Sequence, residues 1–226
     1  MTPDTMKRNA GYAAAELVED GMLIGIGTGS TVRFFIDYLI KRCQKGLKIQ
    51  AVCSSVASYQ QAQKGNLSLL EDKNITAIDI TFDGADEIDP QKRMIKGGGG
   101  ALTREKILAN TSRELVVMID ESKKVEALGS RKLPVEILPF GYAATVSKIK
   151  TLGFRGELRT QASNTPFCTD NGNFIYDIEF HTLRETPEKD HERLIHIPGI
   201  VETGYFFNLA GRIFIGKSTG DVELWN

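Results

Sequence analysis

The stretch MLIGIGTGSTVRFFIDYLI, residues 22–40, decides the fold class of this chain. Its apolar run at residues 22–26 predicts a buried strand, and the glycines that follow predict a tight turn. Apolar side chains then recur at helical spacing, at Val32, Phe35, Ile36, Leu39 and Ile40. We therefore expect a strand, a loop and an amphipathic helix, in that order.

The same pattern returns along the first half of the chain. The segments IQAVC at residues 49–53, AIDITF at 77–82 and ELVVMID at 114–120 each predict a further strand. Short apolar strands that alternate with helices indicate a parallel sheet covered on both faces. The expected fold is α/β, a Rossmann-like open, mostly parallel sheet with helices on both faces.

The pattern changes near Lys132. The segment LPVEILPF at residues 133–140 contains two prolines, and strand-like and helix-like stretches then alternate at closer spacing. We expect residues 132–203 to form a smaller α+β lobe of the ferredoxin-like type. Residues 1–131, joined by the last strands at 204–226, are expected to form the main α/β catalytic domain.

Composition excludes several classes of protein. The 226 residues carry 28 basic and 29 acidic side chains, interspersed along the chain, so a nucleic-acid partner is not expected. The apolar runs are too short for a signal peptide or a membrane span, which argues against a membrane partner. Three widely spaced cysteines fit reduced thiols in a cytoplasmic protein.

The turn at residues 27–31, Gly-Thr-Gly-Ser-Thr, follows the first predicted strand and opens a helix, a context that suits phosphate binding. A dinucleotide site is disfavoured because Ser30 occupies the third glycine position and the next strand ends without an acidic residue. The hydroxyls of Thr28, Ser30 and Thr31 favour a small phosphorylated ligand. The open alternative is a plain turn in which a Ser or Thr caps the helix.

Four consecutive glycines, residues 97–100, stand between Lys96 and a predicted helix that carries Glu105. Glycine increases the entropy cost of folding, so a run of four implies a backbone that passes close to another group or adopts positive φ. The free amides at the helix start point toward this turn. The segment therefore predicts an anion site with a base nearby.

Four acidic residues lie within residues 83–89, DGADEID, at the end of a predicted strand. Strand ends of open parallel sheets commonly form ligand sites, whereas the spacing does not match a calcium loop. A solvated acidic turn is the alternative, and the nearby Lys96 favours instead a site with tuned ionisation.

Two further patterns are weak. The string GRIFIGKS at residues 211–218 matches the letters of a phosphate-binding P-loop, but its apolar middle predicts a strand and no helix follows. The three histidines show no paired spacing, so no metal site is expected from them.

Taken together, several motifs closely resemble those of the type A ribose-5-phosphate isomerases, and the resemblance covers nearly the whole chain. These motifs are GIGTGSTV, SSVAS, DGADEID, KGGGGALTREKI, DESK, LPVEILPF and TDNGNFI. The resemblance implies interconversion of D-ribose 5-phosphate and D-ribulose 5-phosphate in the non-oxidative pentose phosphate pathway. It also implies a homodimer, or a tetramer, that needs no metal and no organic cofactor.

The resemblance further implies the site residues. Glu105 is the expected proton acceptor, and Asp83, Asp86 and Lys96 complete the catalytic set. The expected substrate contacts are Thr28, Gly29, Ser30, Thr31, Asp83, Gly84, Ala85, Asp86, Lys96, Gly97, Gly98, Gly99, Lys123 and Lys7.

These residue types suit an aldose–ketose isomerisation. A base moves a proton between C2 and C1 through an enediolate, whose charged oxygen a lysine and backbone amides stabilise. Two rival functions stay open at this point. One is a metal-dependent sugar-phosphate hydrolase or hydride-shift isomerase that uses the acids of residues 83–89, and the other is a non-catalytic sugar-phosphate sensor.

Overall fold

The computed structural model describes residues 1–226, apart from the side chain of Asn74. The chain divides into two compact units. The first unit comprises residues 1–85, 104–124 and 209–226, and the second comprises residues 86–103 and 125–208.

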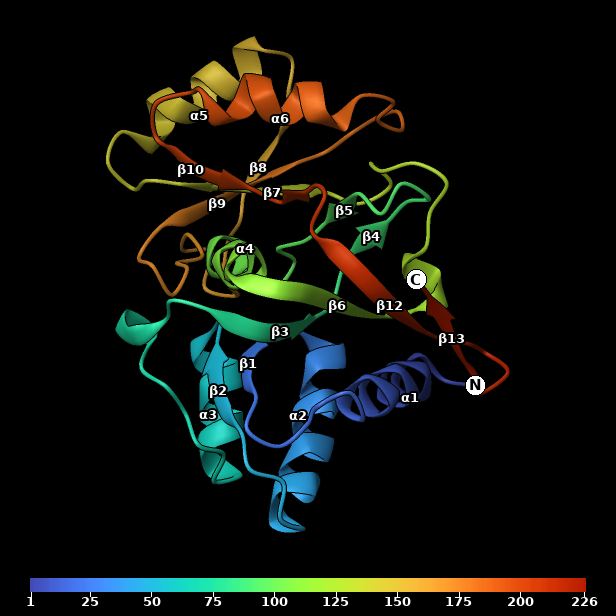
Figure 1. Cartoon of the computed structure of the whole chain (residues 1–226). Helices are drawn as coiled ribbons and strands as arrows, with labels where there is room; N and C mark the ends of the chain where they lie inside the picture. Colours follow the sequence, from blue (N-terminus) through green and yellow to red (C-terminus); the bar gives the residue numbers. More distant parts are fainter. The chain divides into compact units, whose positions relative to one another are not determined.

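The first unit contains a six-stranded sheet in the order β13-β12-β6-β3-β1-β2 (Figure 1). All neighbours pair in parallel except β12 and β13, which are antiparallel. The strands are β1 (Leu23–Ile26), β2 (Gln50–Cys53), β3 (Ile78–Asp83), β6 (Ser112–Asp120), β12 (Ala210–Gly216) and β13 (Val222–Trp225). The mostly parallel sheet predicted from the sequence is confirmed.

Helices cover both faces of this sheet, as predicted. Figure 1 shows α1, α2 and α3 on one face and α4 on the other. Two adjacent residues of β2 lie on opposite faces of the sheet. Ala51 packs in the core cluster that contains Phe35 of α2, whereas Val52 packs with Leu108 of α4. The helices are α1 (Pro3–Ala15), α2 (Ser30–Gln44), α3 (Val56–Lys64) and α4 (Leu102–Thr111), with 3-10 turns η1 (Asp72–Asn74) and η2 (Glu121–Lys123).

The second unit contains a four-stranded antiparallel sheet in the order β10-β7-β9-β8. Its elements are β7 (Leu133–Ile137), α5 (Tyr142–Thr151), β8 (Gly156–Leu158), β9 (Phe174–Ile178), α6 (Pro187–Ile195) and β10 (Ile200–Thr203). This β-α-β-β-α-β order with β9 between β7 and β8 is the split arrangement of ferredoxin-like folds. Apolar residues of β7 pack with Ile149 of α5 and Leu194 of α6 to form its core.

A small antiparallel sheet also belongs to the second unit. It contains β4 (Glu87–Ile88), β5 (Met94–Ile95) and β11 (Tyr205–Phe206), in the order β11-β5-β4. The ferredoxin-like elements lie inside the predicted lobe at 132–203. The compact unit extends beyond it, because residues 86–103, 125–131 and 204–208 group with the second unit, whereas the sequence placed them in the main domain.

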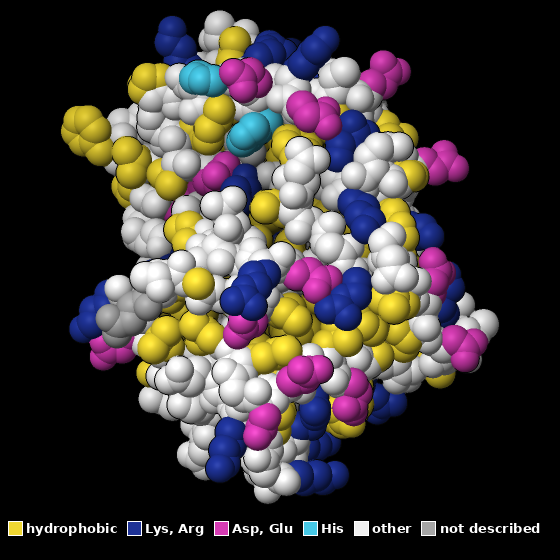
Figure 2. Space-filling view, in the orientation of Figure 1, with side chains coloured by type: hydrophobic (Ala, Val, Ile, Leu, Met, Phe, Trp, Pro, Cys, Tyr) yellow, Lys and Arg dark blue, Asp and Glu magenta, His cyan; other side chains and the backbone are white. Residues whose placement is uncertain are grey.

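Across the described residues, no helix combines the length and apolar character needed to cross a membrane. Figure 2 shows basic and acidic side chains interspersed over the face in view.

Candidate active site

The carboxyl ends of β1 and β3 lie side by side at the point where the strand order reverses. From β1 the chain crosses to β2 on one side and returns to β3 on the other. Open α/β sheets bind ligands at such a switch point. The loop at residues 27–31 follows β1, and Asp83 is the last residue of β3, so both sequence motifs meet there.

Asp83 is held against the loop after β1. Its side chain is 1 % exposed, and its Oδ1 accepts hydrogen bonds from the amides of Thr28, at 3.1 Å, and Gly84, at 2.7 Å. A Cβ on Gly27 would lie 2.0 Å from Asp83 Cγ. Gly27 is therefore needed for this close approach.

The helix after this loop is not capped by a hydroxyl. Gly29 stands at the N-cap of α2 with φ of 125°, a conformation that L side chains rarely adopt, and it has no side-chain cap. The alternative of a Ser- or Thr-capped turn is therefore wrong. The Thr28 hydroxyl instead lies 2.8 Å from that of Ser54, at the end of β2.

Two serines that support this loop were not predicted as site residues. Ser54 is 1 % exposed and bonds Thr28, and Ser58 Oγ donates to the carbonyl of Gly27 at 2.6 Å. Ser55 caps α3 by accepting from the Ser58 amide. The Ser-Ser-x-x-Ser pattern at the start of a helix could have identified these two serines from the sequence.

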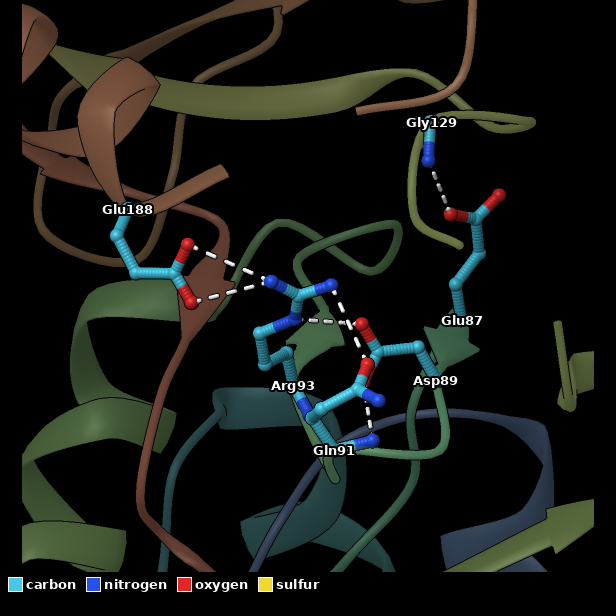
Figure 3. A network of polar contacts seen from close by, with 6 residues as sticks. All are labelled: Glu87, Asp89, Gln91, Arg93, Gly129 and Glu188. Atoms are coloured by element: carbon cyan, nitrogen blue, oxygen red, sulfur yellow. Dashed lines mark hydrogen bonds and ion pairs between the residues drawn. The ribbon is translucent and has the colours of Figure 1, made fainter. Parts of the chain in front are cut away.

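The acidic segment 83–89 is not a solvated turn. Asp83, Glu87 and Asp89 are each at most 1 % exposed. Figure 3 shows the Arg93 guanidinium between Asp89 and Glu188, with Nε donating to Asp89 Oδ2 at 2.6 Å. Glu87 accepts from the Gly129 amide at 2.7 Å and from the Ser130 hydroxyl. Glu87 and Asp89 thus support the fold.

Asp86 and the glycine segment come together in the second unit. Asp86 Oδ2 accepts the Gly98 amide at 2.8 Å, and a Cβ on Gly98 would lie 2.9 Å from Asp86 Oδ1. Gly97 and Gly100 have φ of 100° and 83°. The run therefore combines positive φ with close approach, as the sequence predicted.

Lys96 is buried at 3 % exposure at the start of this run. Its amide donates to Gly204 O at 2.8 Å, and its Nζ lies 5.3 Å from the ring centroid of Phe206 in β11. A cation that close to an aromatic face is attracted by the ring. The fold therefore keeps a cation out of bulk water next to the glycines.

Glu105 occupies the first turn of α4 and is 3 % exposed. Lys123 ends η2 and is half-buried, and Asp120 caps that turn by accepting from the Ser122 amide at 3.1 Å. Lys7 lies on α1, with Nζ 3.9 Å from Asp4 Oδ1. All three belong to the first unit, together with residues 28–31 and 83–85.

Residues 211–218, which match the P-loop string, lie in strand β12 and in the turn after it, as the apolar middle of the string predicted. Lys217 of this string pairs with Glu223 at 2.8 Å. Setting aside the undescribed Asn74 side chain, no three His, Cys, Asp or Glu residues are grouped so that they could hold a metal ion.

Comparisons with known proteins identify one family over most of the chain. The family model described as ribose 5-phosphate isomerase A (phosphoriboisomerase A) matches residues 50–220. Ribose-5-phosphate isomerase A of Protochlamydia amoebophila is 48% identical over 218 residues, which cover 96% of this chain and 94% of the relative.

Solved structures extend the similarity to the fold. Ribose 5-phosphate isomerase from Plasmodium falciparum is 34% identical with a TM-score of 0.94, covering 99% of this chain and 98% of that one. A D-ribose-5-phosphate isomerase in complex with phospho-erythronic acid is also 34% identical with a TM-score of 0.94, and each chain is covered completely.

Proposed function

The chain belongs to the ribose 5-phosphate isomerase A family, and we propose that Glu105 is the proton-transferring base of its reaction. The enzyme is an aldose–ketose isomerase that interconverts D-ribose 5-phosphate and D-ribulose 5-phosphate in the pentose phosphate pathway. The observation that carries the proposal is a buried carboxylate, Glu105, in the first helical turn after the glycine segment 97–100.

The reaction moves one proton from C2 to C1 and a second from O2 to O1. A base removes the proton at C2 of the open-chain aldose, which leaves an enediolate with negative charge on O1. A proton then passes from the O2 hydroxyl to O1, and return of the first proton to C1 gives the ketose. Glu105 serves as this shuttle in our proposal. A carboxylate suits the role because it accepts the proton and gives it back within one turnover.

Lys96 and the glycine amides stabilise the enediolate oxygen. A preorganised donor at such a position typically lowers the barrier by about 3 kcal/mol. Support comes from the burial of Lys96, since a charge interacts more strongly with a developing anion where water is excluded. Asp83 and Asp86 move protons among the ring oxygen and the hydroxyls, first to open the sugar.

The substrate phosphate binds at residues 28–31, with Lys123 and Lys7 as cationic partners. The positive φ of Gly29 brings the amides of the α2 start to the end of β1, and helix starts attract phosphate. A relative with the same fold binds phospho-erythronic acid, which carries a phosphate as the substrate does.

Metal and organic cofactors take no part in the proposed reaction. The rival functions, a metal-dependent hydrolase and a non-catalytic sensor, find no support in the family match. We further propose that the enzyme is a homodimer of the cytoplasm. Sedimentation of the purified enzyme would test the dimer, and fractionation of the cells would test the location.

Substitution of the base is the decisive experiment. Glu105→Gln should lower kcat about 1,000-fold, since a positioned base typically contributes about 100- to 10,000-fold and an amide cannot accept this proton. Glu19→Gln is the control, because it makes the same chemical change on an exposed side chain of the same unit. Near-normal turnover by Glu105→Gln would contradict the proposal.

Two further measurements distinguish the proposed reaction from the rival functions. In deuterium oxide the wild-type enzyme should introduce solvent deuterium at C1 or C2 of the sugar, which a hydride shift or a sensor would not do. Activity should survive exhaustive chelation, whereas a loss restored by a divalent cation would point to a metal-dependent reaction.

A further inference from the structure

The guanidinium of Arg159, just after β8, binds both an aspartate and the glycine segment. Its Nε and Nη2 donate to the two carboxylate oxygens of Asp177, at 2.8 and 2.6 Å. Its Nη1 donates to the carbonyls of Gly97 and Gly98, each at 3.1 Å. The side chains of Arg159 and Asp177 are only 17% and 14% exposed, and all four residues belong to the second unit.

These bonds set the direction of two consecutive peptide groups. In a trans peptide the C=O and the N–H point in opposite directions. The group that joins Gly97 to Gly98 has its oxygen on Arg159 and its N–H on Asp86 Oδ2, at 2.8 Å. The next group also has its oxygen on Arg159, which turns the Gly99 N–H away from the guanidinium.

We propose that Arg159 is a positioning residue of the isomerase, which presets the Gly98 and Gly99 amides and the Asp86 carboxylate for the reacting end of the sugar. The inference rests on the proposed function, which assigns the enediolate to this segment. Consecutive glycines otherwise sample many conformations, and donors contribute most to catalysis when they are oriented before the reaction begins.

Arginine suits this role because its planar fork presents five donors in a fixed geometry. Asp177 accepts from Nε and Nη2 and so fixes the plane of the fork, and both glycine carbonyls accept from Nη1. Phe167 packs on the same group, with its ring centroid 5.6 Å from the Arg159 Cζ. A lysine is a point charge on a flexible stem and sets no such plane.

A second arginine of the same unit offers a matched control. Arg184 donates Nε and Nη2 to Asp190, at 2.6 and 2.8 Å, and packs 4.9 Å from the ring centroid of Phe180. The two sites therefore share the ion pair and the aromatic contact. Contact with the glycine carbonyls of residues 97 and 98 distinguishes Arg159.

The experiment compares Arg159→Gln with Arg184→Gln in kinetics and thermal unfolding. Arg159→Gln should lower kcat about 100-fold with KM within about threefold, because a small misplacement of catalytic groups costs about that factor. The kcat of Arg159→Lys should exceed that of Arg159→Gln by less than about tenfold. Arg184→Gln should lose comparable thermal stability and keep kcat within about twofold.

Equal losses of kcat in the two glutamine variants would overturn the inference, since destabilisation alone would then explain them. If Arg159→Gln keeps wild-type kcat while Glu105→Gln is inactive, the inference fails and the proposed function stands. If Glu105→Gln stays active, the proposed function is what fails.

Should Arg159→Gln not fold, Asp177→Asn answers the same question. It keeps the guanidinium and weakens the contact that orients it. We expect kcat to fall about tenfold at nearly constant KM, and an unchanged kcat would overturn the inference.

Discussion

Gly27→Ala tests whether the close approach of backbone and carboxylate at the end of β1 positions Asp83. The added Cβ would lie 2.0 Å from Asp83 Cγ and Oδ1, whereas ordinary contact begins at 3.4 Å. The carboxylate must therefore retreat by about 1.4 Å, the difference between these two distances. That movement breaks its hydrogen bonds from the Thr28 and Gly84 amides, now 3.1 and 2.7 Å.

The energetic cost follows from these two effects. Overpacking a tight site costs about 1 to 3 kcal/mol, and each hydrogen bond to a charged group contributes about 1.5 to 3 kcal/mol. Because such terms are not additive, we expect a loss of about 3 to 5 kcal/mol in the free energy of unfolding. For a chain of this size that lowers the Tm by roughly 6 to 20 °C. Displacement of Asp83 should also lower kcat about 100-fold.

Gly65→Ala is the control for this prediction. Its Cβ would lie 2.2 Å from the flexible Cδ1 of Ile40, so the collision is similar but involves an apolar side chain. It should cost about 1 to 3 kcal/mol and leave kcat within about twofold. The assays are thermal unfolding followed by circular dichroism and steady-state turnover of ribose 5-phosphate. A Gly27→Ala enzyme with wild-type Tm and kcat, or equal kcat losses in both variants, would refute the reasoning.

Two more predictions concern side chains outside the catalytic set. Burial raises the pKa of the Cys53 thiol to about 12 from an ordinary 9.0, so iodoacetamide at pH 8 should alkylate the exposed Cys168 well before Cys53, as peptide mass spectrometry would show. Because the folded state keeps this proton while the unfolded state loses it, stability should also fall as the pH rises from 9 to about 12. Glu136 is fully buried and accepts from the Thr103, Thr169, Asn171 and Asn173 side chains. Glu136→Gln removes the negative charge that these four donors share and should cost about 2 to 4 kcal/mol in urea unfolding. The exposed Glu157→Gln should cost less than about 0.5 kcal/mol, and equal costs would contradict this account.

Much of the fold was predictable because its signals are local. The apolar run and glycine turn at residues 22–31 predicted β1 and the start of α2, and both were confirmed. The ferredoxin-like order of the second unit also followed from alternating short strands and helices. The limits of the units were harder to predict, because residues 86–103 group with elements that lie far along the chain.

The candidate site was predicted less evenly. Glycine runs flanked by a lysine, and acids at the ends of predicted strands, are unusual enough to attract attention in a sequence. The four acids of residues 83–89, however, have similar side chains, so residue type alone did not separate Glu87 and Asp89 from Asp83 and Asp86, which the family resemblance singled out. Their separation depends on partners such as Arg93 and Gly129, which only folding brings near.

The sequence by itself determined the order of strands and helices, the glycine turns and the residue types available for proton transfer, because each depends on neighbours along the chain. The tertiary structure alone decided which carboxylates support the fold and which groups hold the glycine segment. Arg159 and Gly97, for example, are 62 residues apart and meet through one hydrogen bond. Such contacts depend on how β8 and β9 place side chains in space, and no local pattern encodes that placement.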